Sequence, residues 1–319
     1  MKAAVITRYG GPEVLEIRDV PEPVHKAGRV LVHVEAAGVN FADLMAAQGM
    51  YPGTPQPPLV AGREFAGRRW DTGERVMGYT QHSAFAEKVV AAEQLLWPVP
   101  ENWTAAQAAG FPVSYFTAYF AYWKAGLLGD AGRGARVLIH AAAGGVGTAA
   151  VQIGGILGAE TFGTASSNDK LEKVRQLGLR HPINYVEHDY VDQIRKLTAG
   201  QGVNAVFEML GGEHVVKSVA CLRFLGRVIS YGAATGEPAR FDPRILYEKQ
   251  TSVHGLWLSP LSLHEEIMQP AWQQLSQWIA AGRLRPVVGH TFPLEQAAEG
   301  FRLLKERRNF GKVVLEVRS

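Results

Sequence analysis

The residues most able to do chemistry form a glycine-rich turn, His140-Ala-Ala-Ala-Gly-Gly-Val-Gly-Thr-Ala-Ala150, between a strand-like and a helix-like apolar run. In that setting Gly144 permits a tight turn, Gly145 lets the backbone approach a pyrophosphate, and Gly147 lets the helix pack close to the sheet. The helix N-terminus then offers N–H groups and partial positive charge to the phosphates. The stretch predicts a dinucleotide site, although Ala142 stands where the strict pattern has its first glycine. A tight turn without a ligand is the alternative.

The end of the next strand indicates which dinucleotide binds. NAD-specific sites usually carry an acid there, which binds the ribose 2′-hydroxyl. Here the strand ends in Phe162-Gly-Thr-Ala-Ser-Ser167, without an acid. Ser166, Lys170 and Tyr185 instead offer a hydroxyl, an ammonium and a phenol, which suit a 2′-phosphate through charge-assisted hydrogen bonds. We therefore predict NADP(H) as the cofactor; the alternative for Lys170 is a solvated helix lysine.

Strands and helices alternate from Arg136 onward, which predicts an α/β fold with a parallel sheet and helices on both its faces. The expected strands are 137–140, 160–164, 182–185, 205–209, 227–231 and 251–258. The expected helices between them are 145–157, 169–177, 190–197 and 212–221. The N-terminal third consists of short strands broken by turns, which predicts a mostly β unit. Thr104 is the expected cap of a helix, and another helix is expected from Pro112.

Length, charge and cysteine content exclude several classes of protein. The 319 residues exceed one ordinary core and favour two domains. The 33 Lys and Arg against 30 Asp and Glu leave a dispersed net charge of +3, so nucleic acid is not an expected partner. The single cysteine, Cys221, excludes an intramolecular disulfide and a thiolate-rich zinc site. The N-terminus has no signal-peptide core and no apolar run reaches ~18 residues, so we expect a cytoplasmic protein without a membrane span.

Short motifs that occur in order along the whole chain carry a family resemblance. They are Gly10-Gly-Pro-Glu-Val-Leu15, Ala37-Gly-Val-Asn-Phe-Ala-Asp43, Gly62-Arg-Glu-Phe-Ala-Gly67, Ala141-Ala-Ala-Gly-Gly-Val-Gly-Thr148, Gly163-Thr-Ala-Ser-Ser167, Ile183-Asn-Tyr185 and Asn309-Phe-Gly-Lys-Val-Val-Leu315. In these motifs the chain resembles the zinc-independent quinone oxidoreductases of the medium-chain dehydrogenase/reductase superfamily, which include zeta-crystallin. The resemblance implies a GroES-like catalytic domain, residues 1–112 and 256–319, split around a Rossmann domain, residues 113–255. The cofactor is then expected in the cleft between them.

Within that resemblance, zinc is not expected. Zinc-dependent relatives place a cysteine where Asn40 stands and a histidine where Arg63 stands, and their structural zinc needs four further cysteines. Glu64 alone cannot hold a zinc ion, because a catalytic site takes about three protein ligands. Without a Lewis acid, an enzyme lacks the usual means of stabilising an alkoxide. Acceptors that take a hydride with little help, such as quinones or activated alkenes, are therefore favoured.

The resemblance also implies roles for individual residues. Asn40 is the expected catalytic residue, near the nicotinamide, where it would orient the acceptor oxygen. The other expected cofactor-binding residues are Thr117 at the domain junction, Gly144, Gly145, Val146 and Gly147 at the pyrophosphate, Ser166, Lys170 and Tyr185 at the 2′-phosphate, Tyr231 and Gly232 beneath a ribose, Leu256, Trp257 and Leu258 along the nicotinamide, and Asn309 closing the site. The alternatives are a buried aromatic for Trp257 and a turn residue for Asn309.

The chain departs from the family pattern in two places. Several relatives carry a tyrosine and an arginine near the substrate, where this chain has Met45 and Ala47. The stretch 68–76 also replaces a longer one, and its shortness is expected to trim the rim of the cleft.

These observations favour an NADPH-dependent quinone reductase that works without zinc. One alternative is reduction of the activated double bond of an enone or enoyl thioester, for which Tyr51 and Tyr79 are candidate proton donors. Another is an NADPH-binding protein without a catalytic task, as zeta-crystallin illustrates. The apolar segment 251–258 would end the parallel sheet, and an exposed edge strand invites pairing with its copy, so we expect a homodimer.

Overall fold

The computed structural model describes residues 1–24 and 27–317. The chain divides into two compact units. The first unit comprises 1–114, 262–269 and 285–319, and the second comprises 115–261 and 270–284. The expected domain boundaries fall at 112/113 and 255/256. The residues 256–261 and 270–284 group with the second unit rather than with the C-terminal part of the first.

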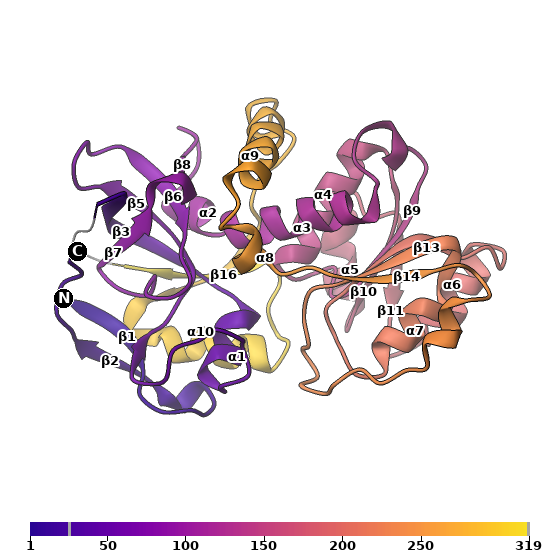
Figure 1. Cartoon of the computed structure of the whole chain (residues 1–319), viewed down its shortest axis with the longest axis horizontal. Coiled ribbons are helices and arrows are strands. Elements are labelled where there is room, and N and C mark those ends of the chain that lie inside the picture. Colours follow the sequence, from indigo (N-terminus) through magenta and orange to yellow (C-terminus); the bar gives the residue numbers. More distant parts are fainter. Residues whose placement is uncertain (25–26, 318–319) are drawn as a thin grey trace. The chain divides into compact units, whose positions relative to one another are not determined.

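The second unit is built on a six-stranded sheet with the order β11-β10-β9-β12-β13-β14, in which every pairing is parallel. Its strands are β9 (Arg136–Ile139), β10 (Glu160–Ala165), β11 (His181–Asn184), β12 (Val203–Glu208), β13 (Leu222–Ser230) and β14 (Ser252–Gly255). Its helices are α3 (Pro112–Ala125), which begins in the first unit, α4 (Gly145–Leu157), α5 (Asn168–Arg175), α6 (Tyr190–Leu197), α7 (His214–Ala220), α8 (Leu258–Leu261) and α9 (Glu265–Ala280), which also spans both units. Figure 1 shows α3 and α4 on one face of this sheet and α6 and α7 on the other. The predicted parallel sheet with helices on both faces is confirmed.

The strands of this sheet form because their residues are apolar on both faces. Val137, Leu138 and Ile139 of β9 are fully buried, as are Val206 and Phe207 of β12. A parallel strand covered on both sides must have such a run, because helices exclude water from both faces.

Several elements differ from their expected bounds, most by one or two residues, and for three elements the structure shows what sets the bound. The strand expected at 251–258 ends at Gly255, because Gly255 pairs with Ser230 and β13 has no further residue to offer. The strand expected at 227–231 begins earlier, at Leu222, and its register with β12 is irregular before Arg227. The helix expected at 212–221 begins only at His214, because Gly211 and Gly212 have φ of 79° and 55°, outside the helical region.

The first unit is mostly β. Its seven-stranded sheet has the order β15-β16-β3-β5-β6-β8, with β7 also pairing with β3, and a three-stranded sheet has the order β2-β1-β4. The strands are β1 (Lys2–Ile6), β2 (Leu15–Asp19), β3 (Arg29–Val39), β4 (Leu59–Val60), β5 (Glu64–Arg69), β6 (Arg75–Tyr79), β7 (Lys88–Ala92), β8 (Leu96–Pro98), β15 (Val288–Pro293) and β16 (Lys312–Glu316). Its helices are α1 (Phe41–Ala47), α2 (Ala105–Ala109) and α10 (Ala297–Lys305). Single 3-10 turns are η1 (Pro12–Val14), η2 (Glu93–Leu95) and η5 (Leu294–Gln296), with η3 (Gly129–Gly132) and η4 (Pro243–Leu246) in the second unit.

A large apolar core lies in the first unit. It contains three completely buried phenylalanines, which are Phe65 of β5, Phe301 of α10 and Phe85 in the segment before β7. Valines of β3 and β16 pack in the same core. Thr104 caps α2 as expected, since its hydroxyl accepts a hydrogen bond of 3.1 Å from the Gln107 N–H. The core thus fixes β3, β5 and β16 side by side, and the ends of these strands carry the polar groups described below.

Candidate cofactor site and active site

The second unit has a topological switch point between β9 and β12. The chain runs outward from β9 through β10 to β11, then returns to place β12 on the other side of β9. The loops that follow β9 and β12 therefore leave the sheet in opposite directions and leave a crevice at the carboxyl ends of the strands. Open sheets of this kind bind ligands at that crevice. The glycine-rich turn follows β9 and lies at this place.

The glycine-rich turn fits a pyrophosphate. Gly144 is the N-cap of α4 and supplies no side chain to bind the first N–H groups of the helix, which have no acceptor within the helix. A Cβ on Gly147 would lie 2.3 Å from the Ala141 carbonyl oxygen, so only glycine allows α4 to pack this close to the turn. Ala141 itself takes the left-handed conformation, with φ of 48°. A side-chain-free helix N-terminus at the crevice is a suitable anion site.

The residues predicted to bind a 2′-phosphate come from neighbouring places at the same edge. Ser166 directly follows β10 and Tyr185 directly follows β11, and the Tyr185 N–H donates to the Ala165 carbonyl at 3.2 Å. Lys170 lies in the first turn of α5, whose N-cap Ser167 accepts a hydrogen bond from the Lys170 N–H at 3.4 Å. Burial lowers the pKa of the Lys170 ammonium, an effect that an anionic partner would oppose.

The remaining predicted residues of the second unit lie farther along the same sheet edge or on helices. Tyr231 follows β13, and its N–H donates to the Glu208 carbonyl at 2.9 Å. The adjacent Gly232 packs closely on Met209, whose carbonyl oxygen would be 2.8 Å from a Cβ there. Trp257 follows β14 and is 40% exposed, so it is not the buried aromatic of the alternative interpretation. Its neighbours Leu256 and Leu258 are buried, as is Thr117 on α3.

Glu208 is a buried acid at the switch point that the sequence interpretation did not single out. It ends β12, and one carboxylate oxygen accepts the N–H groups of Leu210 at 2.6 Å and Gly211 at 2.9 Å. The other oxygen accepts from the Ser230 hydroxyl at 3.3 Å. Burial raises the pKa of Glu208, and these hydrogen bonds oppose the rise. Glu208 therefore shapes the loop that leaves the sheet beside the glycine-rich turn.

Asn40 belongs to the first unit, where its side chain lies in a buried polar network. Its amide oxygen accepts from the Lys312 ammonium at 2.6 Å, and its amide nitrogen donates to Glu64 Oε1 at 2.9 Å and to the Gly38 carbonyl at 3.3 Å. Lys312 and Glu64 also form an ion pair. The other carboxylate oxygen of Glu64 accepts from the Val113 N–H at 2.7 Å, at the first turn of α3.

A second buried ion pair adjoins this network. Arg63 Nη1 donates to Asp43 Oδ1 at 2.9 Å, while Asp43 Oδ2 accepts from the backbone N–H of Asn40 at 2.9 Å. Burial raises the pKa of Asp43, and the Arg63 guanidinium opposes that rise. The guanidinium also lies over the Tyr51 ring, 4.0 Å from its centroid. Tyr79 is buried, whereas Met45 and Ala47 lie on α1 directly after Asn40.

Within residues 1–24 and 27–317, no group of three or more His, Cys, Asp or Glu side chains is placed to hold a metal ion. At Asn40 and Arg63, the positions of the relatives' zinc ligands, the structure instead brings an amide and a guanidinium into contact with a lysine and two carboxylates. Asn309 donates through its amide to the Gly311 carbonyl at 3.2 Å, so it stabilises the turn before β16.

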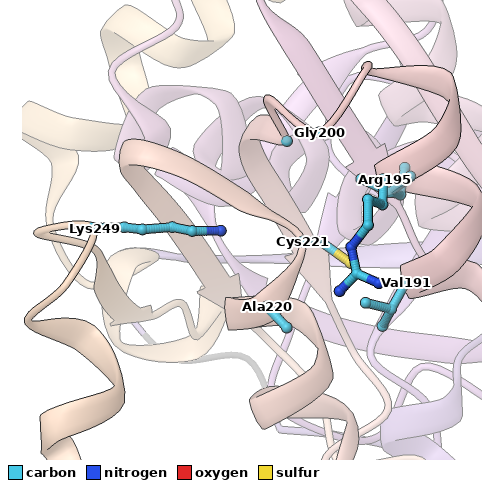
Figure 2. A pocket seen from close by; sticks show the side chains of 8 residues that line it. Val191, Arg195, Gly200, Ala220, Cys221 and Lys249 are labelled. Atoms are coloured by element: carbon cyan, nitrogen blue, oxygen red, sulfur yellow. The ribbon is translucent and has the colours of Figure 1, made fainter.

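A small pocket lies at the amino ends of the strands of the six-stranded sheet (Figure 2). The glycine-rich turn lies at the other ends of these strands, their carboxyl ends. Gly202 and Cys221, which directly precede β12 and β13, line the pocket. Figure 2 shows the side chains of Arg195 and Lys249 on either side of Cys221. Burial raises the pKa of Cys221 to about 12, so its thiol is protonated and unreactive at neutral pH. The pocket belongs to the amino ends of the strands and is not the cofactor crevice.

The helices of the part of the chain that the structure describes include none long and apolar enough to span a membrane.

Comparison with known proteins adds to this geometry. The alcohol dehydrogenase GroES-like domain model matches residues 26–101, and the zinc-binding dehydrogenase model matches residues 145–281. The chain is 34% identical to the synaptic vesicle membrane protein VAT-1 homolog of Danio rerio, over 98% of this chain and 69% of that protein. These matches confirm the expected GroES-like unit and Rossmann-type unit.

Two solved structures are similar over the whole length. The quinone oxidoreductase of Thermus thermophilus, solved also in complex with NADPH, is 36% identical with a TM-score of 0.87, covering 99% of this chain and all of that one (100%). CurK enoyl reductase is 27% identical with a TM-score of 0.87, covering 99% of each chain.

Proposed function

This chain belongs to the medium-chain dehydrogenase/reductase superfamily, in the group of quinone oxidoreductases and VAT-1-like proteins, and we propose that it transfers a hydride from NADPH to a quinone without zinc. The comparisons support an NAD(P)-dependent oxidoreductase of that superfamily. We propose three further points: the cofactor is NADPH, the reaction needs no zinc, and the acceptor is a quinone. Each is supported by different residues.

The choice of NADPH is supported by the groups that follow β10 and β11. Ser166 directly follows β10, Tyr185 directly follows β11 and Lys170 lies in the first turn of α5, and the stretch 162–167 that ends β10 contains no acid to bind a ribose 2′-hydroxyl. Gly144, Gly145, Val146 and Gly147 would hold the pyrophosphate at the N-terminus of α4. When bound, NADPH would supply the hydride, while the protein supplies binding, orientation and exclusion of water.

The buried network around Asn40 is the observation that carries the proposal of chemistry without zinc. Two buried cations, Lys312 and Arg63, lie within hydrogen-bond reach of Glu64 and Asp43. Both carboxylates are thus neutralised, and a divalent cation placed among these groups would be repelled by the two resident cations. An acceptor that needs no Lewis acid then suits the site, and quinones are such acceptors.

Double-bond reduction is the second candidate. The similarity to an enoyl reductase favours it, and Tyr51 beside the Arg63 guanidinium offers a hydroxyl in the first unit. Tyr79 is the weaker candidate donor, because it is buried in the core.

An acceptor screen separates these functions. NADPH oxidation would be followed with a panel of quinones and with a panel of enones and enoyl thioesters. Each panel would be measured both with and without a strong chelator. We expect turnover of quinones that the chelator leaves unchanged. Turnover of enones alone would favour the second candidate, loss of turnover with chelator would contradict the zinc-free proposal, and tight NADPH binding without turnover would indicate a non-catalytic protein.

We also propose that β14 pairs with its copy in a homodimer. β14 is the last strand of its sheet and pairs with β13 along one side. Light scattering at micromolar concentration should give twice the monomer mass, and a monomeric mass would contradict the proposal.

A further inference from the structure

The pocket at the amino ends of the strands is formed by the second unit alone. Three segments meet there: α6 with the loop that leads to β12, the end of α7, and the stretch that precedes β14. Its volume is about 60 Å³, and one water needs roughly 10–15 Å³, so the pocket takes a group of a few heavy atoms. None of the residues proposed to bind the cofactor lines it.

The loop from α6 to β12 gives the pocket a fixed wall. The buried Thr198 hydroxyl donates to the Ile194 carbonyl at 2.7 Å and accepts from the Gly202 N–H at 2.9 Å. The Gly200 N–H donates to the Arg195 carbonyl at 2.8 Å. Both glycines that line the pocket thus have their N–H groups satisfied. A ligand in the pocket must therefore be bound by side chains.

Lys249 brings a positive charge to the pocket that no carboxylate neutralises. Its backbone carbonyl accepts from the Leu225 N–H at 2.8 Å, and its ammonium donates to the Leu222 carbonyl at 2.9 Å. Within residues 1–24 and 27–317 that carbonyl is the only acceptor of the ammonium, and no acid pairs with it. An ammonium has three N–H groups, so Lys249 is held in place with donors to spare.

Arg195 brings a second positive charge, from the last turn of α6. Its one ion pair, with Asp192 at 3.3 Å, is exposed to solvent and uses a single N–H. Such pairs contribute little, and the other N–H groups of the guanidinium are available. The other acid near the pocket, Asp189, caps α6 by accepting the Val191 N–H at 2.7 Å. It also has the Lys217 ammonium at 3.9 Å.

The side chains of Lys249 and Arg195 lie on either side of Cys221 (Figure 2). This thiol is 2% exposed, and burial raises its pKa to about 12, so it carries no charge at neutral pH. A neutral thiol does not repel an anion, and its S–H is a weak donor. Two cations that line one small pocket repel each other, and an anion between them would remove that repulsion.

We propose that this pocket binds a divalent oxyanion of the phosphate type between Arg195 and Lys249. A dianion balances both cations, the guanidinium fork suits oxyanions, and one phosphate group agrees with the volume of the pocket. The group is either free phosphate or the end of a small phosphate monoester. By joining α6 to the stretch before β14, it would stabilise the second unit. The site does not depend on the proposed function, because it needs neither cofactor nor acceptor.

Calorimetric titration with inorganic phosphate, glycerol 3-phosphate and acetate at constant ionic strength tests the site. The variants are Lys249→Gln, which keeps a donor for the Leu222 carbonyl, and Arg195→Gln. Lys196→Gln is the matched control, because that exposed lysine of α6 does not line the pocket. Lys170→Ala removes the cation of the proposed 2′-phosphate site, which is another place expected to attract phosphate.

We expect wild type to bind phosphate, and Lys249→Gln and Arg195→Gln to weaken binding by about 10- to 100-fold, the range for hydrogen bonds to charged groups. Lys196→Gln and Lys170→Ala should retain the wild-type affinity. Tighter binding of glycerol 3-phosphate would identify a monoester as the ligand, and tighter binding of inorganic phosphate would identify the free ion. Absence of binding, acetate that binds as tightly as phosphate, or binding that only Lys170→Ala weakens would overturn the proposal.

Cys221 gives a second readout, which locates the bound ion. It is the only cysteine, so alkylation by a small neutral maleimide, followed by mass spectrometry without denaturant, reports on this pocket alone. Saturating phosphate should slow the alkylation of wild type and Lys196→Gln, but not of Lys249→Gln. If the variants fail to fold, wild type still decides: an unchanged rate of alkylation at saturating phosphate would overturn the proposal. A protein that reduces no quinone gives the same test.

Discussion

Gly163 of β10 lies directly beneath Ala142 of the glycine-rich turn: a Cβ on Gly163 would come within 2.8 Å of the Cβ of Ala142. The Ala142 N–H also donates to the Thr164 carbonyl at 2.9 Å, so turn and strand are in contact at this point. The absence of the first glycine of the strict motif is thus matched by a glycine in the neighbouring strand. The turn keeps its close approach to the sheet although Ala142 carries a methyl group.

Replacing Gly163 with Ala should displace the turn. The added methyl group would overlap Ala142 and Leu179, at a cost of roughly 1–3 kcal/mol of unfolding free energy, and NADPH affinity should fall with it. Urea unfolding and cofactor titration measure the two effects. Gly155→Ala on α4 is the matched control, since a Cβ there meets nothing within 4 Å and should add about 0.5–1 kcal/mol of stability. Equal behaviour of the two variants would refute the packing argument.

Replacing Arg63 with Met should destabilise the first unit strongly. The change leaves the Asp43 carboxylate buried without its ion-pair partner, which typically costs about 3–5 kcal/mol. Combining Arg63→Met with Asp43→Asn removes the unpaired charge, so much of that loss should be recovered. Chemical denaturation of wild type, Arg63→Met and the double variant measures both the loss of stability and its recovery. A double variant no more stable than Arg63→Met would show that packing of the arginine on Tyr51, rather than charge, is the source of the stability.

His140 makes stability depend on pH in the acid range. Its ring is buried between the hydroxyls of Thr164, at 3.1 Å, and Ser218, at 3.2 Å, and burial lowers its pKa to about 3. Below the unfolded pKa of ~6.5 the unfolded chain binds a proton that the folded protein does not, so stability present above that pH is lost as the pH falls. Between pH 7.5 and 4.5 the loss from this group reaches roughly 2–3 kcal/mol. Urea unfolding of His140→Gln should show a smaller difference between the two pH values than wild type; an identical difference would contradict the assignment.

Local patterns predicted most of the second unit. The helix bounds 145–157 and 190–197 agree with α4 and α6, because each helix has a clear change of composition at both ends. The strand from Leu222 was found only in part, because Arg223, Phe224 and Leu225 are exposed and lack the pattern of a buried parallel strand. The sequence predicts the type of a segment whose residues are uniformly buried. It does not predict the first and last residues of a segment in which buried and exposed residues are mixed.

The long-range contacts of the candidate site were less accessible from sequence. Lys312 joins Asn40 across 272 positions, and that contact depends on the register of β16 against β3, which no local pattern encodes. A signal existed nonetheless: Lys312 begins an otherwise apolar run, Lys-Val-Val-Leu, in which a buried charge must have a partner. Glu208 ends the apolar stretch of β12 in the same way.

The cofactor is the central claim, and titration with NADPH and NADH tests it most directly. Wild type, Lys170→Ala and Lys173→Ala would be compared by nicotinamide fluorescence, where the exposed Lys173 of the same helix is the control. We predict tight NADPH binding that Lys170→Ala weakens by about 10- to 100-fold, the range for one charge-assisted hydrogen bond, with NADH binding unchanged and Lys173→Ala like wild type. Equal binding of NADPH and NADH by wild type, or equal weakening of both by Lys170→Ala, would contradict the 2′-phosphate site.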